Sequence, residues 1–367
     1  MASTHIPPRP RPQDEPKATP AQRNPLRTLT QSTRHRTTPG GPVTAAFLPA
    51  LTAKASAAAH PNPHPNPRPD TPCDCATPVL TARPDATVIR HGTIVAKAHA
   101  PDTPPTDLTA RLQTAAHPTL ATTLLPPLHL TPTELQGRPV TLWPYGTPVD
   151  RDDPDAAPWE AAATLLARLH TVPPPTTLPH PLPPMRGPAK AAHAVARLHA
   201  AGPHPAAPPV LRAWAALPPW ARAETPPPGP HLLCHGDFHL GQLVRTPEGH
   251  WRLIDVDDLG TGNPAWDLAR PAAWYACGLL APDEWTRFLD TYRGAGGAAV
   301  PADGADPWPA LDVPARALTV QTAALAITKS VAADRPLDEI EQALVDACDR
   351  MSRMPPRPAE LAPETTK

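Results

Sequence analysis

Apolar and polar residues alternate in short runs in the early part of the chain, as in half-buried strands. Residues 86–100 hold two β-rich runs separated by His91-Gly92, which predicts a hairpin. Helical apolar spacing predicts a helix over residues 106–120, which Pro118 limits. The apolar runs within 124–135 and over 138–145 predict further short strands. These elements predict a small, β-rich lobe over residues 78–146.

The pattern becomes mainly helical after residue 147. Helices are predicted over 157–172, 189–202, 208–223 (in two pieces), 265–280, 282–295, 307–331 and 336–354. A strand over 231–237 and a β-hairpin around the Pro-Glu-Gly turn at 247–249 interrupt them. We therefore predict a larger helical lobe over residues 147–354, followed by a disordered tail over 355–367.

Proline sets the N-terminal part of the chain apart. Many of the 61 prolines lie in the first 80 residues, where Lys and Arg also outnumber acidic residues. Proline removes a backbone donor and fixes φ, so residues 1–77 are expected to form a disordered, basic extension. The apolar run over 43–59 contains Pro49 and Lys54 and is short for a membrane span, which favours a short helix.

The composition excludes several partners. The formal charge of −1 over 367 residues gives no reason to expect a nucleic acid or a membrane surface. The five cysteines have no regular spacing, so we expect reduced thiols and a cytoplasmic location. Cys73 and Cys75 are separated by one residue instead of the usual two or more of a metal-ligand pair, and we interpret them as incidental.

The chemistry-bearing side chains gather around the predicted hairpin, in HGDFHLGQ (235–242) and LIDVDD (253–258). Antiparallel pairing brings Gln242 and Asp255 to the same end of the hairpin, where an amide and a carboxylate oxygen suit Mg²⁺. Asp237 is then free to act as a base, and His235 can fix the loop by hydrogen bonds. Together with Lys97, in the middle of an earlier strand, these residues supply the parts for phosphoryl transfer to a hydroxyl.

HGDFHLGQ followed by LIDVDDLGTGNPAWDLA resembles the aminoglycoside phosphotransferase and choline-kinase-like superfamily. The resemblance covers residues 78–350 and implies a bilobal α+β fold of the protein-kinase type that binds ATP and Mg²⁺ between its lobes. It implies that Asp237 is the catalytic base and that Asp255 binds the metal. Gln242 stands at the position of the family's Asn ligand, and HLGQ is similar to maltokinase-like members.

The same resemblance assigns roles to residues away from the hairpin. Lys97 matches the phosphate-binding lysine, and Asp267 matches a carboxylate that braces the catalytic loop. Trp143 and Tyr145, in LWPY (142–145), fall at the interlobe hinge that offers backbone groups to adenine.

The chain departs from the pattern in its first lobe. There is no G-x-G-x-x-G loop before Lys97, and no Glu in the following helix to pair with it. Asp107 and Glu134 are the candidate acidic partners. Beyond the hairpin, we expect Asp257 and Asp258 to be exposed to solvent, and the alternative is that one of them lies beside the metal ligands or the substrate. We expect Trp266, Trp274 and Tyr275 to pack, and the alternative is stacking on an acceptor ring.

The sequence thus favours an ATP-dependent kinase for a hydroxyl of a small, aminoglycoside- or sugar-like molecule. Two alternatives stay open. The Gln242 exchange also suits a non-catalytic nucleotide-binding relative. A metal-dependent hydrolase would use His235, Asp237, His239 and Asp255. The sequence identifies neither the acceptor nor the oligomeric state.

Overall fold

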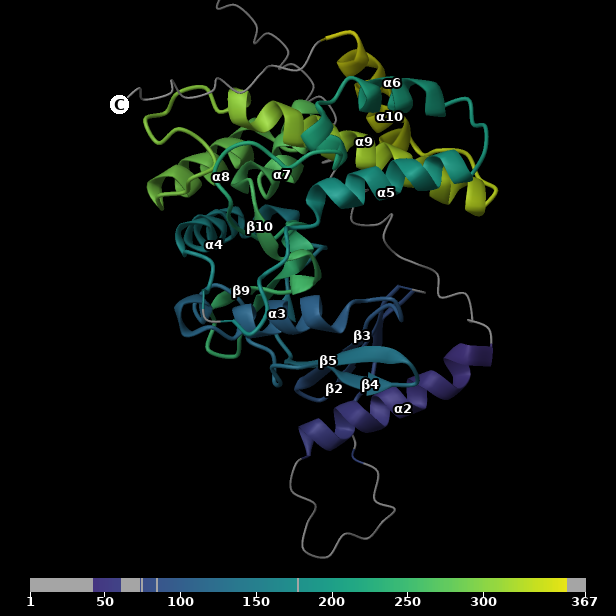
Figure 1. Ribbon diagram of the computed structural model, residues 1–367, viewed down its shortest axis with the longest axis vertical. Coiled ribbons are helices and arrows are strands. Elements are labelled where there is room, and N and C mark those ends of the chain that lie inside the picture. Colours follow the sequence, from purple (N-terminus) through teal and green to yellow (C-terminus); the bar gives the residue numbers. More distant parts are fainter. Residues whose placement is uncertain (1–41, 61–72, 74, 84, 177, 355–367) are drawn as a thin grey trace, which may run out of the picture.

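The computed structural model describes residues 42–60, 73, 75–83, 85–176 and 178–354 (Figure 1). The predicted disorder of residues 1–41, of most of 61–77 and of the tail over 355–367 lies outside the described residues. The described chain forms two lobes, a sheet below and a helical lobe above in Figure 1, as the fold prediction requires.

The N-lobe is built on a five-stranded antiparallel sheet in the order β1-β2-β3-β5-β4. Its strands are β1 (Val79–Ala82), β2 (Thr87–His91), β3 (Ile94–Ala98), β4 (Thr133–Leu135) and β5 (Arg138–Pro144). The β2–β3 hairpin is confirmed, with His91 paired to Ile94 across the turn. Helix α3 (Pro105–Ala115) follows β3 and ends earlier than predicted.

Helix α2 (Pro42–Ala59) packs on one face of this sheet and belongs to the N-lobe. The helix itself was expected, but the boundary at residue 78 was wrong to exclude it. Phe47, Leu51 and Ala55 are buried against Ile89 and the β3 and β5 side chains. The turn-by-turn spacing of these three residues places them on one side of the helix. Figure 1 shows α2 in purple across the outer side of the strands.

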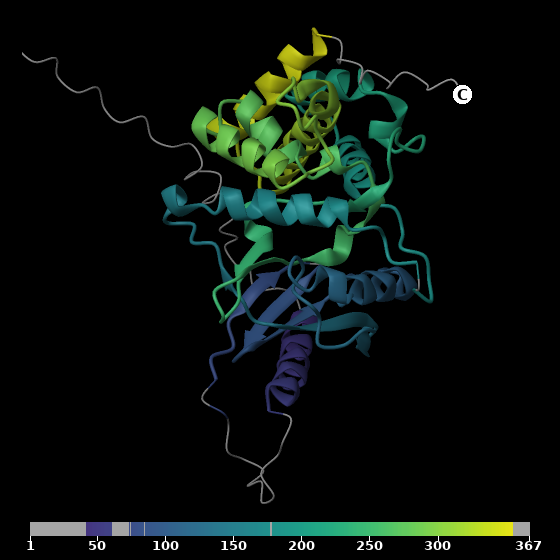
Figure 2. The same ribbon diagram turned by 90° about the vertical axis from the view of Figure 1, so that its left-hand side faces the viewer.

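The C-lobe is mainly helical, as predicted. Its helices are α4 (Trp159–Thr171), α5 (Gly187–Ala200), α6 (Ala207–Ala215), α7 (Ala269–Ala276), α8 (Pro282–Gly294), α9 (Trp308–Ala332) and α10 (Glu339–Ser352). Figure 2 shows α4 crossing the molecule beneath the other helices of this lobe. None of the described helices is both long and apolar enough to cross a membrane.

Short strands carry the polar segments where the lobes meet. β8 (Leu243–Arg245) pairs with β9 (Trp251–Leu253) and with β6 (Thr147–Pro148), and β7 (Leu232–Cys234) pairs with β10 (Gly260–Gly262). The buried core between α4, α8 and these strands holds Trp159, Leu166, Leu243, Leu253 and Phe288. The strands therefore anchor the polar loops to the buried apolar core.

Candidate active site

The loop that follows β7 is held by a buried carboxylate. Asp267 accepts hydrogen bonds from the backbone N–H groups of His235 (2.6 Å) and Gly236 (2.7 Å). It also accepts one from His170 Nε2 on α4, at 3.0 Å. Gly236 has φ +85°, and a Cβ there would lie 2.2 Å from the carbonyl oxygen of Asp258. Only glycine allows this close approach, which sets the direction of the next side chain.

His235 ties the same loop to the hairpin. Its Nε2–H donates to the carbonyl oxygen of Ile254 at 2.8 Å, and its side chain is buried. This is the loop-fixing hydrogen bond expected from the sequence, and it places His235 behind the loop. His239 likewise serves the loop, since its Nδ1 accepts from the N–H of Gly241.

The carboxylate of Asp237 lies between two cations. Lys190 Nζ, from α5, is 2.6 Å from Oδ2, and the Arg270 guanidinium, from α7, is 2.9 Å from Oδ1. Burial would raise the pKa of Asp237, but Arg270 and Lys190 outweigh it and hold the pKa below its ordinary value. The carboxylate is therefore ionised at neutral pH.

Gln242 and Asp255 meet at the end of the hairpin. Leu243 pairs with Leu253 across the two strands, and Gln242 Nε2 donates to Asp255 Oδ2 at 3.3 Å. Asp255 has φ +65°, a left-handed conformation that costs a non-glycine residue free energy. That conformation directs its carboxylate toward both Gln242 and the N-lobe.

Lys97 reaches this carboxylate from the N-lobe. It lies on the face of β3 opposite Ile94, Ala96 and Ala98, which pack toward α2. Its Nζ is 2.6 Å from Asp255 Oδ1 and 2.8 Å from Asp257 Oδ2. Burial would lower the pKa of Lys97, but these two carboxylates raise it well above its ordinary value. Residues far apart in sequence thus form one charged cluster.

The acidic partner of Lys97, which the sequence left open, is neither of the two candidates. Neither Asp107 nor Glu134 forms an ion pair with Lys97 in the described chain, where Asp255 and Asp257 take that place. Asp257 also lies 3.3 Å from His99 Nδ1. Burial would raise the pKa of Asp257, and Lys97 and His99 lower it below its ordinary range.

The prediction that Asp258 is solvent-exposed is also wrong. Its side chain is 11% exposed and lies 2.7 Å from Lys190 Nζ, so Lys190 bridges Asp237 and Asp258. Burial raises the pKa of Asp258 although Lys190 opposes the shift. Trp266, Trp274 and Tyr275 pack in the C-lobe, as expected.

Trp143 and Tyr145, the residues expected at the hinge, lie at the end of β5 and directly after it. The Trp143 indole is buried, and its Nε1–H donates to the Thr141 hydroxyl at 2.9 Å. The backbone N–H of Tyr145 donates to the carbonyl oxygen of Thr93 at 2.7 Å, and Arg90 lies 3.5 Å above the Tyr145 ring. The side chains of both residues are thus occupied by contacts within the N-lobe or the core.

The four hydrolase candidates do not form a metal-binding group in the described chain. Two other groups of His, Cys and Asp do bring three or more ligand atoms within 4.8 Å of one another. One is His170, Cys234 and Asp267 behind the loop that follows β7, and the other lies at the edge of the N-lobe. His235 and His239 are used by loop hydrogen bonds, so the geometry gives the hydrolase no support.

A family model described as the phosphotransferase enzyme family matches residues 86–311, which include every site residue described above. The chain belongs to this phosphotransferase family. The match spans both lobes, from β2 in the sheet to α9 in the helical lobe.

Two solved structures of an aminoglycoside phosphotransferase share the fold. The apo form of a thermostable mutant of aminoglycoside phosphotransferase APH(4)-Ia has a TM-score of 0.51 at 13% identity, over 77% of this chain and 94% of that one. A ternary complex of a thermostable mutant of the same enzyme with AMP-PNP and hygromycin B has a TM-score of 0.51 at 12% identity, over 77% and 95%. A choline/ethanolamine kinase family protein from Mesorhizobium loti has a TM-score of 0.49 at 16% identity, over 84% and 94%.

Sequence reasoning missed three polar residues of this candidate site. Lys190 and Arg270 flank Asp237, and His170 positions Asp267. Lys190 and His170 lie on amphipathic helices, whose pattern alone explains a lysine at the surface and a histidine in the core. The sequence therefore offered no reason to assign either residue to the site. Arg270 follows the Asp-Leu-Ala motif directly, and a search for cations near that motif would have found it.

Proposed function

We propose that the protein is an ATP-dependent kinase that transfers a phosphoryl group to a hydroxyl of a small molecule. The observation that carries this proposal is the contact of Lys97 with Asp255 and Asp257, which joins the N-lobe to the hairpin of the C-lobe. A lysine from a strand, a carboxylate after a hairpin and an aspartate in the preceding loop are the groups that phosphoryl transfer to a hydroxyl requires.

The donor set at the hairpin fits a magnesium ion. Asp255 and Gln242 lie side by side, and rotation of the Gln242 amide would present its oxygen instead of its nitrogen. Asp257 adds a second carboxylate next to them. When bound there, Mg²⁺ would neutralise charge on the ATP phosphates. Lys97 would exchange part of its carboxylate contacts for phosphate oxygens.

Asp237 is the residue that we propose to receive the acceptor's proton. In a loose transition state the hydroxyl proton leaves late, so a base of low pKa is sufficient. Asp267 holds the backbone of His235 and Gly236 and so fixes the position of the Asp237 carboxylate, which aligns the acceptor oxygen. Arg270 donates to Oδ1 of Asp237 and limits the rotation of this carboxylate.

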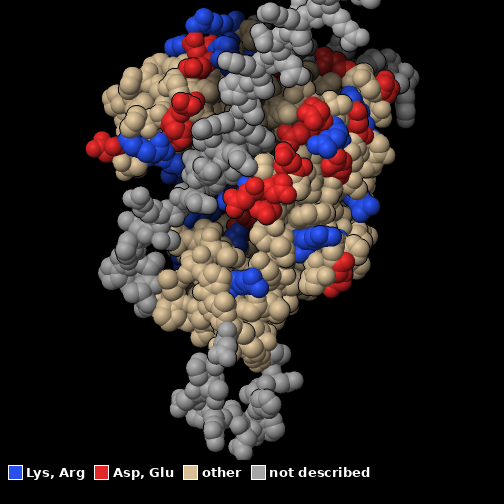
Figure 3. Space-filling model, turned by 180° about the vertical axis from the view of Figure 1, so that it is seen from behind, with Lys and Arg blue, Asp and Glu red and all other residues tan. Residues whose placement is uncertain are grey.

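The charged side chains beside Asp237 limit the charge that the acceptor can carry near its reacting hydroxyl. Lys190 and Arg270 lie within 3 Å of the Asp237 carboxylate, and Lys190 also pairs with Asp258, so these four groups carry no net charge. We therefore propose a sugar-like acceptor that is neutral around the reacting hydroxyl. Figure 3 shows acidic side chains gathered on one face of the molecule, at the level where the lobes meet.

At the hinge, the backbone N–H of Tyr145 is already donated to Thr93. Adenine would therefore be recognised by groups that point away from β3, and the carbonyl oxygen of Pro144 is such a group by strand alternation.

A screen of hydroxylated metabolites, sugars and aminoglycosides with labelled ATP and Mg²⁺ tests the proposal. We expect phosphate transfer to at least one sugar-like compound. Asp237→Asn should lower kcat by about 10²-fold or more while ATP still binds. Asp290→Asn, an exposed carboxylate on α8, is the matched control and should leave kcat unchanged.

The outcomes separate the alternatives. Magnesium-dependent ATP binding without transfer or hydrolysis would identify a non-catalytic relative. Full activity in Asp237→Asn would refute the role of this carboxylate. Hydrolysis without nucleotide would favour the metal-dependent hydrolase.

A further inference from the structure

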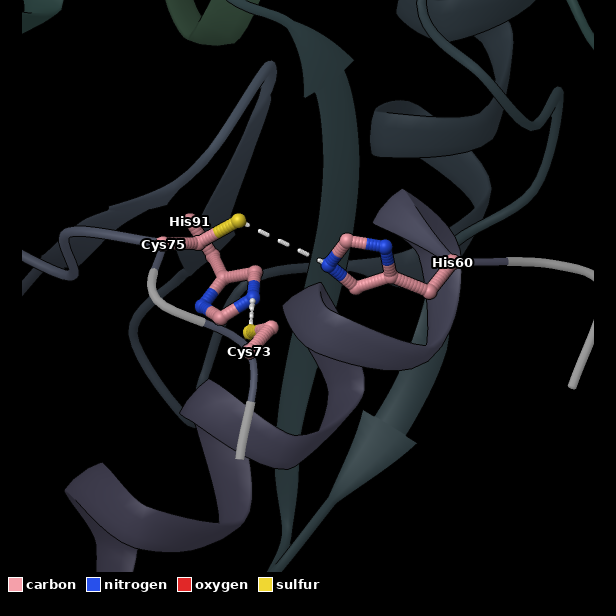
Figure 4. A group of neighbouring side chains, drawn as sticks. All are labelled: His60, Cys73, Cys75 and His91. Atoms are coloured by element: carbon pink, nitrogen blue, oxygen red, sulfur yellow. Dashed lines mark hydrogen bonds between the residues drawn. The ribbon is translucent and has the colours of Figure 1, made fainter. Parts of the chain in front are cut away.

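A second cluster of chemistry-bearing side chains lies at the edge of the N-lobe, away from the active site. We propose that His60, Cys73, Cys75 and His91 form a structural zinc site. Figure 4 shows the two thiols and the two imidazoles facing one another, with His60 at the end of α2. This proposal replaces our interpretation of Cys73 and Cys75 as incidental, because the fold supplies the two further ligands that the sequence pattern lacks.

The separations match a tetrahedral site. One ligand atom from each residue lies within 4.8 Å of all the others. Cys73 Sγ is 3.1 Å from His91 Nε2, and Cys75 Sγ is 3.6 Å from His60 Nε2. Zn–S bonds of about 2.3 Å and Zn–N bonds of about 2.0 Å give tetrahedral edges of about 3.3–3.8 Å. Zinc therefore requires only small side-chain movements.

A further contact fixes the tautomer of His91. Thr77 Oγ1 lies 2.8 Å from His91 Nδ1 and 3.4 Å from the carbonyl oxygen of Cys75. The hydroxyl can donate to the carbonyl and accept from Nδ1–H, which leaves the Nε2 lone pair toward the cluster. Metal-bound histidines commonly donate their other ring N–H in this way, and the partner orients the ring.

The position of the site in the fold points to a structural role. His91 and Ile89 alternate onto the same face of β2, and Ile89 packs in the α2 cluster. Lys97 occupies the opposite face, toward the C-lobe. The site would therefore join the end of α2, the segment before β1 and the β2–β3 turn, on the sheet face away from the candidate active site.

The ligand set selects zinc among common metals. Two thiolates and two imidazoles in tetrahedral arrangement suit Zn²⁺, whereas Mg²⁺ and Ca²⁺ prefer oxygen ligands. All four coordination positions are filled by the protein, which is typical of structural rather than catalytic zinc. On binding, the two thiols release their protons to solvent.

The test begins with the full-length wild-type protein. Elemental analysis after dialysis against metal-free buffer should find about one zinc per chain. Replacement by Co²⁺ should produce thiolate-to-cobalt charge-transfer absorption. Mass spectrometry after thiol alkylation should show Cys73 and Cys75 protected until a chelator is added, with Cys277 unaffected by the chelator. The proposal is overturned if reconstituted wild type holds no zinc and the two thiols react equally with and without it.

Variants locate the metal. The double substitution Cys73→Ser and Cys75→Ser should abolish zinc and the cobalt absorption, and Cys277→Ser should keep both. His60→Ala, at an exposed position, should fold and bind zinc at least tenfold more weakly. Zinc retained by the double variant would place the metal elsewhere. A protein lighter by two hydrogens, with Cys73 and Cys75 joined in a disulfide that takes no zinc, would also refute the site.

Discussion

At the scale of single residues, acidic and basic side chains neutralise one another where the two lobes meet. Asp237 has Lys190 and Arg270, and Asp255 and Asp257 share Lys97. Asp258 shares Lys190 with Asp237. These acidic and basic side chains are paired with one another, so phosphates and an acceptor hydroxyl that bind here would redistribute existing contacts. This makes Lys190 and Arg270 part of the environment that sets the basicity of Asp237.

The pH dependence of activity follows from these residues. The pKa of Asp237 lies below its ordinary value of about 3.9, so the carboxylate is ionised throughout about pH 5–8. Burial and Arg270 lower the pKa of His239 to about 3, so this imidazole is neutral over the same range. We expect no acidic limb from these two groups in kcat/KM, measured with the acceptor found in the screen. An acidic limb near pH 6–7 that persists with different acceptors would contradict the assignment of Asp237 as base and would point to a histidine.

The lowered pKa of Asp237 also affects the stability of the fold. The ionised carboxylate stabilises the folded state at every pH above the pKa that Asp237 has in the unfolded chain. This contribution is lost as the pH falls through the lower pKa of the folded state.

At the scale of secondary-structure elements, helix α2 makes the N-lobe larger than the sequence predicted. Leu51 is fully buried, and Phe47 and Ala55 pack with it against β2, β3 and β5. Without this helix, the apolar face formed by Ile89, Ala96 and its neighbours would be open to water. The helix therefore covers the sheet whose opposite face holds Lys97.

Truncation of the buried leucine tests this packing. Leu51→Ala should lower the free energy of unfolding by about 2–5 kcal/mol, because it removes buried methyl groups and leaves a cavity. Leu130→Ala, at a position that is 51% exposed, should change it by less than about 0.5 kcal/mol. Denaturant unfolding of both variants checks the difference. Equal effects in the two variants would show that α2 does not contribute to the lobe.

At the scale of the whole molecule, the two lobes meet at ionic contacts as well as at packed side chains. Lys97 and His99 of β3 and its continuation contact Asp255 and Asp257 of the C-lobe. Arg111 of α3 donates to the carbonyl oxygen of Leu259 at 2.9 Å. Ligands that bind Lys97 and Asp255 together therefore act on both lobes at once.

Nucleotide binding should for this reason stabilise the entire molecule. At 100 times its Kd, Mg·ATP should raise the free energy of unfolding by about 2.7 kcal/mol, which thermal unfolding detects as a higher Tm. Asp255→Ala, or omission of Mg²⁺, should remove most of the increase, and Asp290→Asn should retain it. An unchanged Mg²⁺ dependence in Asp255→Ala would contradict the proposed ligand role.

Local patterns in the sequence determined most of the secondary-structure elements of this protein. The β2–β3 hairpin, the helices of the C-lobe and the hairpin next to Asp255 follow from apolar spacing and turn residues, which act over a few neighbours. The proximity of Gln242 and Asp255 follows from the pairing of two strands that are adjacent in sequence. Strand β1 was missed because three of its four residues are exposed and it lacks a buried alternation.

Only the tertiary structure decided which distant residues meet. Lys97 pairs with acids about 160 residues away, Lys190 crosses from α5 to Asp237, and His60 and His91 reach the Cys73 and Cys75 pair. These contacts depend on how α2, α3 and α5 pack on the sheet and the loops. Packing is set by the shape of whole apolar faces, so no local pattern in the chain encodes it.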